Sequence, residues 1–186
     1  MTSINNQVAM DKAYWTVFAR RFLVEELPGP LTRASPHLQL FDNYIPNTRM
    51  RIRSIRVPET KAWLHLLQQI HYPTAEDAAT SRVAQIVLDE AEYAQFQIFE
   101  GEEIRKNRYE YEYDGREFMI DVHLGDLRGL NVARVEFADH AEMRGFATPV
   151  FAVAEVTGHP FFSGPALVGK TFADVQLAAA DLEQLN

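Results

Sequence analysis

Hydrophobic and polar residues alternate along most of the chain, with the period of two that is typical of half-buried β-strands. The clearest case is "TRMRIRSIRV", in which arginine alternates with apolar residues up to Pro58. The segment 61–70 fits a strand or a helix equally well by itself. With it, the pattern predicts about eight strands, over residues 14–24, 37–45, 48–57, 61–70, 81–88, 103–113, 116–124 and 130–137.

Short links between these segments predict hairpins and helices. Pro46-Asn47 joins two strands, and Asp114-Gly115 is a strong signal for a tight turn. Asp89 is a suitable N-cap for a helix that ends near Gly101. Three helices are therefore predicted, over residues 90–101, 139–145 and 172–185.

About eight largely antiparallel strands most readily close into a barrel, because closure leaves no unpaired strand edge. A sandwich of two sheets is the alternative. We therefore predict an α+β fold built on a closed eight-stranded antiparallel β-barrel with flanking helices. The 186 residues form one domain in this interpretation, with a core over about 14–170 and a C-terminal helix over about 172–185.

The charge is unevenly distributed. The formal net charge of −8 argues against general nucleic-acid binding, which needs a broad positive surface. Four arginines nevertheless fall within a short stretch, at positions 49, 51, 53 and 56. An acidic protein with concentrated arginines suggests a local anion site. The chain has no cysteine, which excludes disulfides and thiolate metal sites.

The chain carries no segment that predicts a membrane partner. Its first residues lack the apolar stretch with basic flanks of a secretory signal. No apolar run approaches the roughly 20 residues that span a bilayer. We therefore expect a cytoplasmic protein.

Alternate residues of a strand share a face, so several charged side chains are predicted to point the same way. The residues between them, such as Ile52, Ile120 and Val135, are apolar. The apolar face must pack against other elements, so we expect helices to cover the outside of the barrel while the charged side chains line its interior. The charged pairs that share a face are Arg51 and Arg53, Lys106 and Arg108, Asp121 and His123, and Arg134 and Glu136.

Five segments, taken in order, resemble the CYTH family of triphosphate tunnel metalloenzymes. The resemblance covers residues 15–168 approximately. The family includes class IV-type adenylyl cyclases and thiamine triphosphatases. It implies an eight-stranded tunnel in which basic residues grip a triphosphate and acidic residues hold Mg²⁺ or Mn²⁺. The segments are "RRFLVEELP", "RMRIR", "IRKNRY", "FMIDVHLGDLRGLNVARVEF" and "PVFAVAEVTGHPFFSGPAL".

The family's acidic signatures are largely missing. Its first Glu-x-Glu-x-Lys motif falls on Val17, Ala19 and Arg21, and a later acidic pair falls on Ala84 and Ile86. By resemblance, Asp121 and Glu136 remain as metal ligands. The positions that match phosphate-binding residues, with Arg134 added, are Arg21, Arg51, Arg53, Arg82, Lys106, Arg108 and Arg134.

These residues are compatible with more than one chemistry. Arginine suits phosphate through planar, bidentate hydrogen bonds. The same arginines could instead be solvated or paired with internal carboxylates. Asp121 and Glu136 could hold one Mg²⁺ against a bound phosphate, or they could pair with Arg134.

Three hypotheses follow. The first is a degenerate tunnel that binds a triphosphate, polyphosphate or nucleotide-like anion with little or no catalysis. The second is a weak Mg²⁺-dependent triphosphatase, which is favoured over a cyclase because nothing selects a purine or activates a ribose hydroxyl. The third is a non-catalytic scaffold whose barrel is internally salt-bridged. A phosphate-rich small molecule is the expected partner, and the sequence predicts no oligomeric state.

Overall fold

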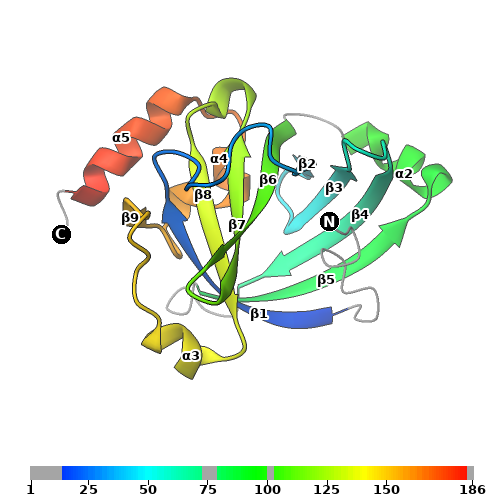
Figure 1. Ribbon diagram of the computed structural model, residues 1–186. Helices are drawn as coiled ribbons and strands as arrows, with labels where there is room; N and C mark the ends of the chain where they lie inside the picture. The colour runs from blue at the N-terminus through cyan, green and yellow to red at the C-terminus, as the bar shows by residue number, and fades with distance from the viewer. Residues whose placement is uncertain (1–13, 73–78, 100–102, 184–186) are drawn as a thin grey trace.

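The structure is a computed structural model that describes residues 14–72, 79–99 and 103–183 (Figure 1). Its strands form one antiparallel sheet in the order β5-β4-β3-β2-β6-β7-β8-β1-β9, and an additional β5–β1 pairing closes the sheet. The strands are β1 (Tyr14–Leu23), β2 (Leu38–Tyr44), β3 (Met50–Arg56), β4 (Trp63–His71), β5 (Thr80–Leu88), β6 (Glu103–Tyr113), β7 (Arg116–His123), β8 (Asn131–Phe137) and β9 (Ala154–Glu155).

Strand β1 closes the barrel because it serves two neighbours in turn. Its first half pairs with β5, from Tyr14 to Phe18, and its second half pairs with β8, from Phe18 to Leu23. The predicted closed antiparallel barrel is thus confirmed, and the sandwich alternative is wrong. The segment 61–70, whose pattern fits a strand or a helix equally well, forms strand β4. Strand β9 was not predicted, since two residues are too few to show a period.

The predicted turns follow from backbone conformations that few residues adopt. Asp114 and Gly115 have φ angles of 51° and 70°, the left-handed pair that a tight hairpin turn requires. They join β6 to β7 directly, with Tyr113 opposite Arg116. Asn47, with φ of 59°, lies in the link between β2 and β3.

Helices occupy the predicted positions with shorter bounds. Asp89 caps α2 (Glu90–Phe96) in a reciprocal capping box with Glu92. The α-helix then tightens to a 3₁₀ turn, η1 (Gln97–Phe99), and the expected end near Gly101 lies outside the described residues. The other helices are α3 (His140–Gly145), α4 (Gly164–Leu167) and α5 (Phe172–Glu183), with further 3₁₀ turns η2 (Gly125–Leu127) and η3 (Pro160–Phe162). The last two residues predicted for α5 also lie outside the described residues.

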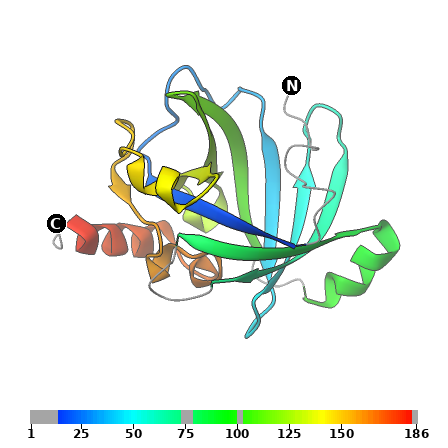
Figure 2. The ribbon, with the colours of Figure 1, turned by 90° about the horizontal axis from the view of Figure 1, so that it is seen from below.

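Apolar residues pack against the outside of the barrel and against one of its ends. On the outer face of β1, β7 and β8, Phe22, Ile120 and Val135 are fully buried under chain segments that include Leu31 and Phe151. Irregular segments therefore do much of the covering that was expected of helices. Helices α4 and α5 instead form a second cluster with the ends of β1 and β6. Figure 2 shows α5 and α2 on different sides of the barrel.

No helix within the described ranges has both the length and the apolar character needed to cross a bilayer.

Candidate anion-binding cavity

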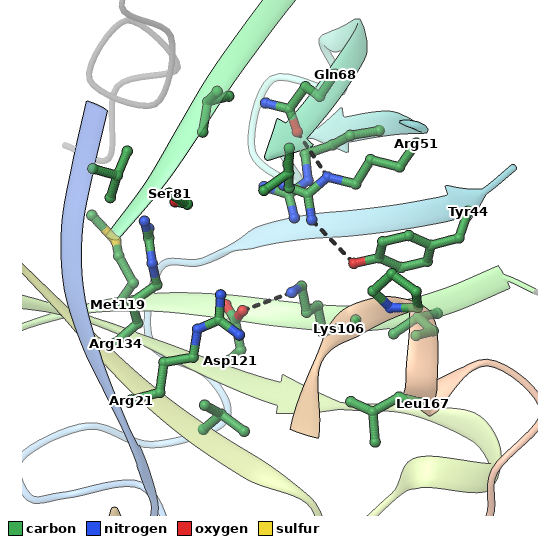
Figure 3. A pocket seen from close by; sticks show the side chains of 18 of the residues that line it. Arg21, Tyr44, Arg51, Gln68, Ser81, Lys106, Met119, Asp121, Arg134 and Leu167 are labelled. Atoms are coloured by element: carbon green, nitrogen blue, oxygen red, sulfur yellow. Dashed lines mark hydrogen bonds and ion pairs between the residues drawn. The ribbon is translucent and has the colours of Figure 1, made fainter. Parts of the chain in front are cut away.

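A cavity of about 480 Å³ lies inside the barrel, in the size range of small-molecule sites (Figure 3). Its charged wall comes from β1, β3, β6, β7 and β8, because alternate residues of these strands point inward. Asp121 and Glu136 are the acidic residues of its lining. The basic residues of the lining are Arg21, Arg49, Arg51, Arg53, Lys106, Arg108 and Arg134.

The cavity brings together all the predicted phosphate ligands except one. Arg82 is exposed and lies outside the cavity. The residues on either side of it, Ser81 and Val83, line the cavity instead. The resemblance matches β5 one position out of register. Because successive side chains of a strand point to opposite faces, this shift assigns the exposed Arg82 to the inner face. Arg49 lines the cavity in addition, and Nη1 of Arg49 lies 2.7 Å from Nδ1 of His71.

Asp42 is a buried acidic residue beside the cavity that the sequence did not single out. It has no exposed surface, and its two carboxylate oxygens accept hydrogen bonds from Arg53 Nε at 2.6 Å and Nη2 at 2.7 Å. Burial alone would raise the pKa of this carboxyl, but the charges of Arg53, Arg51 and Lys106 hold the pKa far below its ordinary value. The only signal in the sequence was its position two residues after Leu40, which places both on one face of the predicted strand 37–45.

A second buried carboxylate–arginine pair lies on the neighbouring strands. Asp121 accepts hydrogen bonds from Arg108 Nε at 2.6 Å and Nη2 at 2.8 Å. Lys106 connects the two pairs, because its Nζ lies 2.8 Å from Asp121 Oδ2 and 3.5 Å from Asp42 Oδ2. Burial lowers the pKa of Lys106 to about 8, although both carboxylates favour its charged form. In Asp121 the two cations outweigh burial and hold the pKa well below its usual range.

Two arginines face each other across β1 and β8. Arg21 and Arg134 are directly opposite in the strand register, and Figure 3 shows both side chains at the same part of the cavity. Arg134 Nη1 lies 2.6 Å from Glu136 Oε1. Within the described residues Arg21 has no carboxylate partner, and its Nη2 donates to the Tyr72 hydroxyl at 3.2 Å. Burial lowers the pKa of Arg134, and repulsion from Arg21 adds to this against the attraction of Glu136.

Arg51 is held in position mainly by neutral groups, with one longer contact of 3.5 Å from its Nη1 to Asp42 Oδ2. Its Nε donates to Gln68 Oε1 at 2.8 Å, and its Nη1 donates to the Tyr44 hydroxyl at 3.1 Å. Gln68 in turn donates from Nε2 to Gln85 Oε1 at 2.5 Å. The two shorter hydrogen bonds, to Gln68 and Tyr44, fix the direction of the guanidinium without cancelling its charge, and Asp42 is shared with Arg53 and Lys106.

The described part of the site carries excess positive charge. Its seven cations face the carboxylates Asp121 and Glu136 of the lining and Asp42 behind it, which leaves a formal charge of +4. Burial lowers the pKa of His123 to about 4, so this ring is neutral at pH 7. The chain as a whole carries −8. The opposite wall is uncharged and includes Val17 of β1, Leu66, Gln68 and Ile70 of β4, and Ser81 and Val83 of β5.

The predicted metal ligands do not come together. Asp121 is opposite Val132 of β8, and Glu136 lies four residues further along that strand, a separation of about 13 Å at the rise of a β-strand. No group of three or more metal-binding side chains occurs in the described ranges. Both oxygens of Asp121 already accept hydrogen bonds from Arg108. The acidic residues present therefore do not fit a shared Mg²⁺ or Mn²⁺ ion, which needs several oxygen ligands at one point.

The fold has solved counterparts. No protein-family model and no curated protein matches the sequence. Two structures of a protein called NE1496 are similar to it, one described as a hypothetical protein and the other as an inorganic triphosphatase. They share 22% and 23% identity with the chain, each with a TM-score of 0.56. The matches cover 83% of this chain and 99% and 95% of theirs.

At this level of identity the likeness shows the fold. The chain has the closed tunnel barrel that its resemblance to the CYTH family implied, so that expectation is confirmed for the architecture.

Proposed function

We propose that the cavity binds a phosphate-rich small molecule: a triphosphate, a polyphosphate or a nucleotide-like anion. The observation that carries this proposal is the pair of opposed arginines, Arg21 and Arg134, in a cavity with a formal charge of +4. Like charges directly opposite on neighbouring strands are destabilising. An anion with several phosphate groups relieves that repulsion.

Arginine geometry supports the same ligand class. Guanidinium groups bind phosphate through paired, charge-assisted hydrogen bonds. Arg51 and Arg21 lose little to competing carboxylates, since each donates mainly to neutral oxygens of Gln68, Tyr44 and Tyr72. The uncharged wall of β4 and β5 leaves room for an organic group next to the phosphates.

We further propose that binding proceeds with little or no turnover. Asp42 and Asp121 are engaged by arginines, which leaves few oxygens for a catalytic ion. The second candidate is a weak Mg²⁺-dependent triphosphatase, and the structural likeness to NE1496, described as an inorganic triphosphatase, favours it. The third candidate, a non-catalytic scaffold, is favoured by the internal Asp42–Arg53 and Asp121–Arg108 pairs.

Calorimetric titration with sodium tripolyphosphate in the presence of a chelator tests the proposal. We expect binding by the wild type and a loss of about 10- to 100-fold in affinity for Arg134→Met, because a hydrogen bond to a charged group is worth about 1.5–3 kcal/mol. Arg128→Met is the matched control, since Arg128 is exposed and lies outside the cavity. A nucleoside triphosphate in the same titration tests the uncharged wall.

Phosphate-release assays separate the alternatives. Release that requires Mg²⁺ and disappears in Glu136→Gln supports the triphosphatase over the binding module. If tripolyphosphate binds neither in the presence of chelator nor in the presence of Mg²⁺, the non-catalytic scaffold is the correct interpretation.

A further inference from the structure

We propose that the Lys106 ammonium takes the place of a divalent cation in this cavity. The anion then binds to the metal-free protein, and Mg²⁺ weakens binding because it competes for the same phosphates. This inference rests on the proposed function and specifies the form of the ligand, which is the free polyanion and not its Mg²⁺ complex.

The first argument is the position of Lys106. Strand β6 lies between β2 and β7 in the sheet, so its inward residue reaches a carboxylate on either side. Lys106 pairs in register with Leu40, two positions from Asp42, and with His123, two positions from Asp121. Its Nζ is 3.5 Å from one carboxylate and 2.8 Å from the other. A single positive group thus bridges two acidic side chains from different strands, as a bound metal ion would.

The second argument is that an arginine already engages both oxygens of each carboxylate. Asp42 accepts from Nε and Nη2 of Arg53, and Asp121 accepts from Nε and Nη2 of Arg108. A Mg²⁺ ion at this point would displace Lys106 and compete with the arginine Nη2 groups for the same two Oδ2 atoms. It would also bring two positive charges in place of one beside Arg53 and Arg108, which are buried and already face one carboxylate each. The donor set therefore suits an ammonium group and not a divalent ion.

The third argument concerns the ligand. An ammonium has three N–H donors, and the two carboxylates leave one of them for an anion. The cavity has a formal charge of +4. It therefore attracts a free polyphosphate more strongly than the Mg²⁺ complex of the same polyphosphate, whose negative charge is smaller by two. Lys106 supplies locally the charge that a metal would otherwise bring with the ligand.

The first test uses metal alone. Electron paramagnetic resonance with Mn²⁺ and the wild-type protein is expected to detect no ion bound in the cavity. One Mn²⁺ bound per chain and released by Asp42→Asn or Asp121→Asn overturns the inference, whatever the result with polyphosphate.

The second test uses calorimetry with tripolyphosphate, in chelator and in excess Mg²⁺. We expect the wild type to lose about tenfold or more in affinity when Mg²⁺ is present. Lys106→Met is expected to bind at least about tenfold more weakly than wild type in chelator, and Lys106→Arg, which keeps the charge, to bind more tightly than Lys106→Met. Lys170→Met is the matched control, because Lys170 is exposed and outside the cavity.

The outcomes are distinct. Wild-type binding that Mg²⁺ strengthens, or Lys106→Met binding as tightly as wild type, overturns the inference and leaves the proposed function intact. Absence of tripolyphosphate binding in both conditions overturns the proposed function itself. If Lys106→Met does not fold by circular dichroism, the two wild-type titrations and the Mn²⁺ experiment still decide.

Discussion

Asp42 lies between three cations, and Arg53 holds both of its oxygens. Taking such a pair out of water is costly, and the cost is offset only while both partners remain. The residue therefore compensates the cations around it and holds them in a fixed arrangement. Its loss should be felt first as lower stability and only then as weaker binding.

We predict that Asp42→Asn lowers the free energy of unfolding by about 3–5 kcal/mol, since the amide leaves Arg53 buried without its counter-charge. Urea denaturation followed by circular dichroism measures the change. Asp126→Asn is the control at an exposed position and should stay within about 0.5 kcal/mol of wild type. Equal stability of the two variants would show that the Asp42–Arg53 pair contributes little.

Lys106 should make the proposed anion binding depend on pH. Its pKa of about 8 reflects burial and the charges that face it, which are Asp121 and Asp42 in favour of the ammonium and Arg53 and Arg108 against it. His123, which lies on β7 directly opposite Lys106, is neutral above its own pKa of about 4. The ammonium is present below pH 8 and is lost above it. A bound anion raises the pKa of Lys106, so binding takes up protons at and above pH 8.

We therefore predict that affinity for tripolyphosphate falls as the pH rises from 7 towards 10. The ligand titrates as well, so the relevant quantity is the difference between wild type and Lys106→Met. Calorimetry in two buffers of different ionisation enthalpy measures the proton uptake. An identical uptake in the two proteins at pH 8.5 would rule out Lys106 as its source.

At the level of elements, α4 supports the charged wall of the barrel. Gly164, its first residue, packs so closely against the ring and hydroxyl of Tyr44 that an added Cβ would overlap them. The Tyr44 hydroxyl in turn accepts from Arg51 Nη1. The short helix thus holds one end of a chain of contacts that ends at Arg51, one of the cations of the cavity.

We predict that Gly164→Ala displaces Tyr44 and weakens tripolyphosphate binding by about 2- to 10-fold, the value of one ordinary hydrogen bond to Arg51. Gly145→Ala in α3 is the matched control, because nothing lies within 4 Å of its added Cβ. Calorimetry compares the two variants. Unchanged affinity in Gly164→Ala would mean that Tyr44 does not orient Arg51 for the ligand.

The strands were predictable and their mutual alignment was not. Period-two alternation located β3 and β6 to within two residues, most clearly in β3, where Arg51 and Arg53 alternate with Met50 and Ile52. The same pattern cannot say which residues meet across strands. Asp42 lies opposite Arg53 only because β2 and β3 pair in that register, and the sequence gives no local sign of it.

For the whole molecule, closure was predictable from the number of strands, and the composition of the interior was predictable in part. The resemblance located Arg21, Arg51 and Arg134 correctly on the inner face. It misplaced Arg82, and it suggested a metal pair, Asp121 and Glu136, that lie on distant parts of their strands. Both differences arise because similarity along a chain does not fix distances across a barrel.

The contrast between the interior and the remainder of the chain also affects how fast a ligand arrives. With +4 in the cavity and −8 in total, the remaining residues carry −12. An approaching polyanion first meets repulsion and is attracted only near the entrance. Added salt screens this outer barrier, so it should speed entry even as it weakens the final complex. Long polymers, which cannot avoid the acidic exterior, would be held back more than short ones.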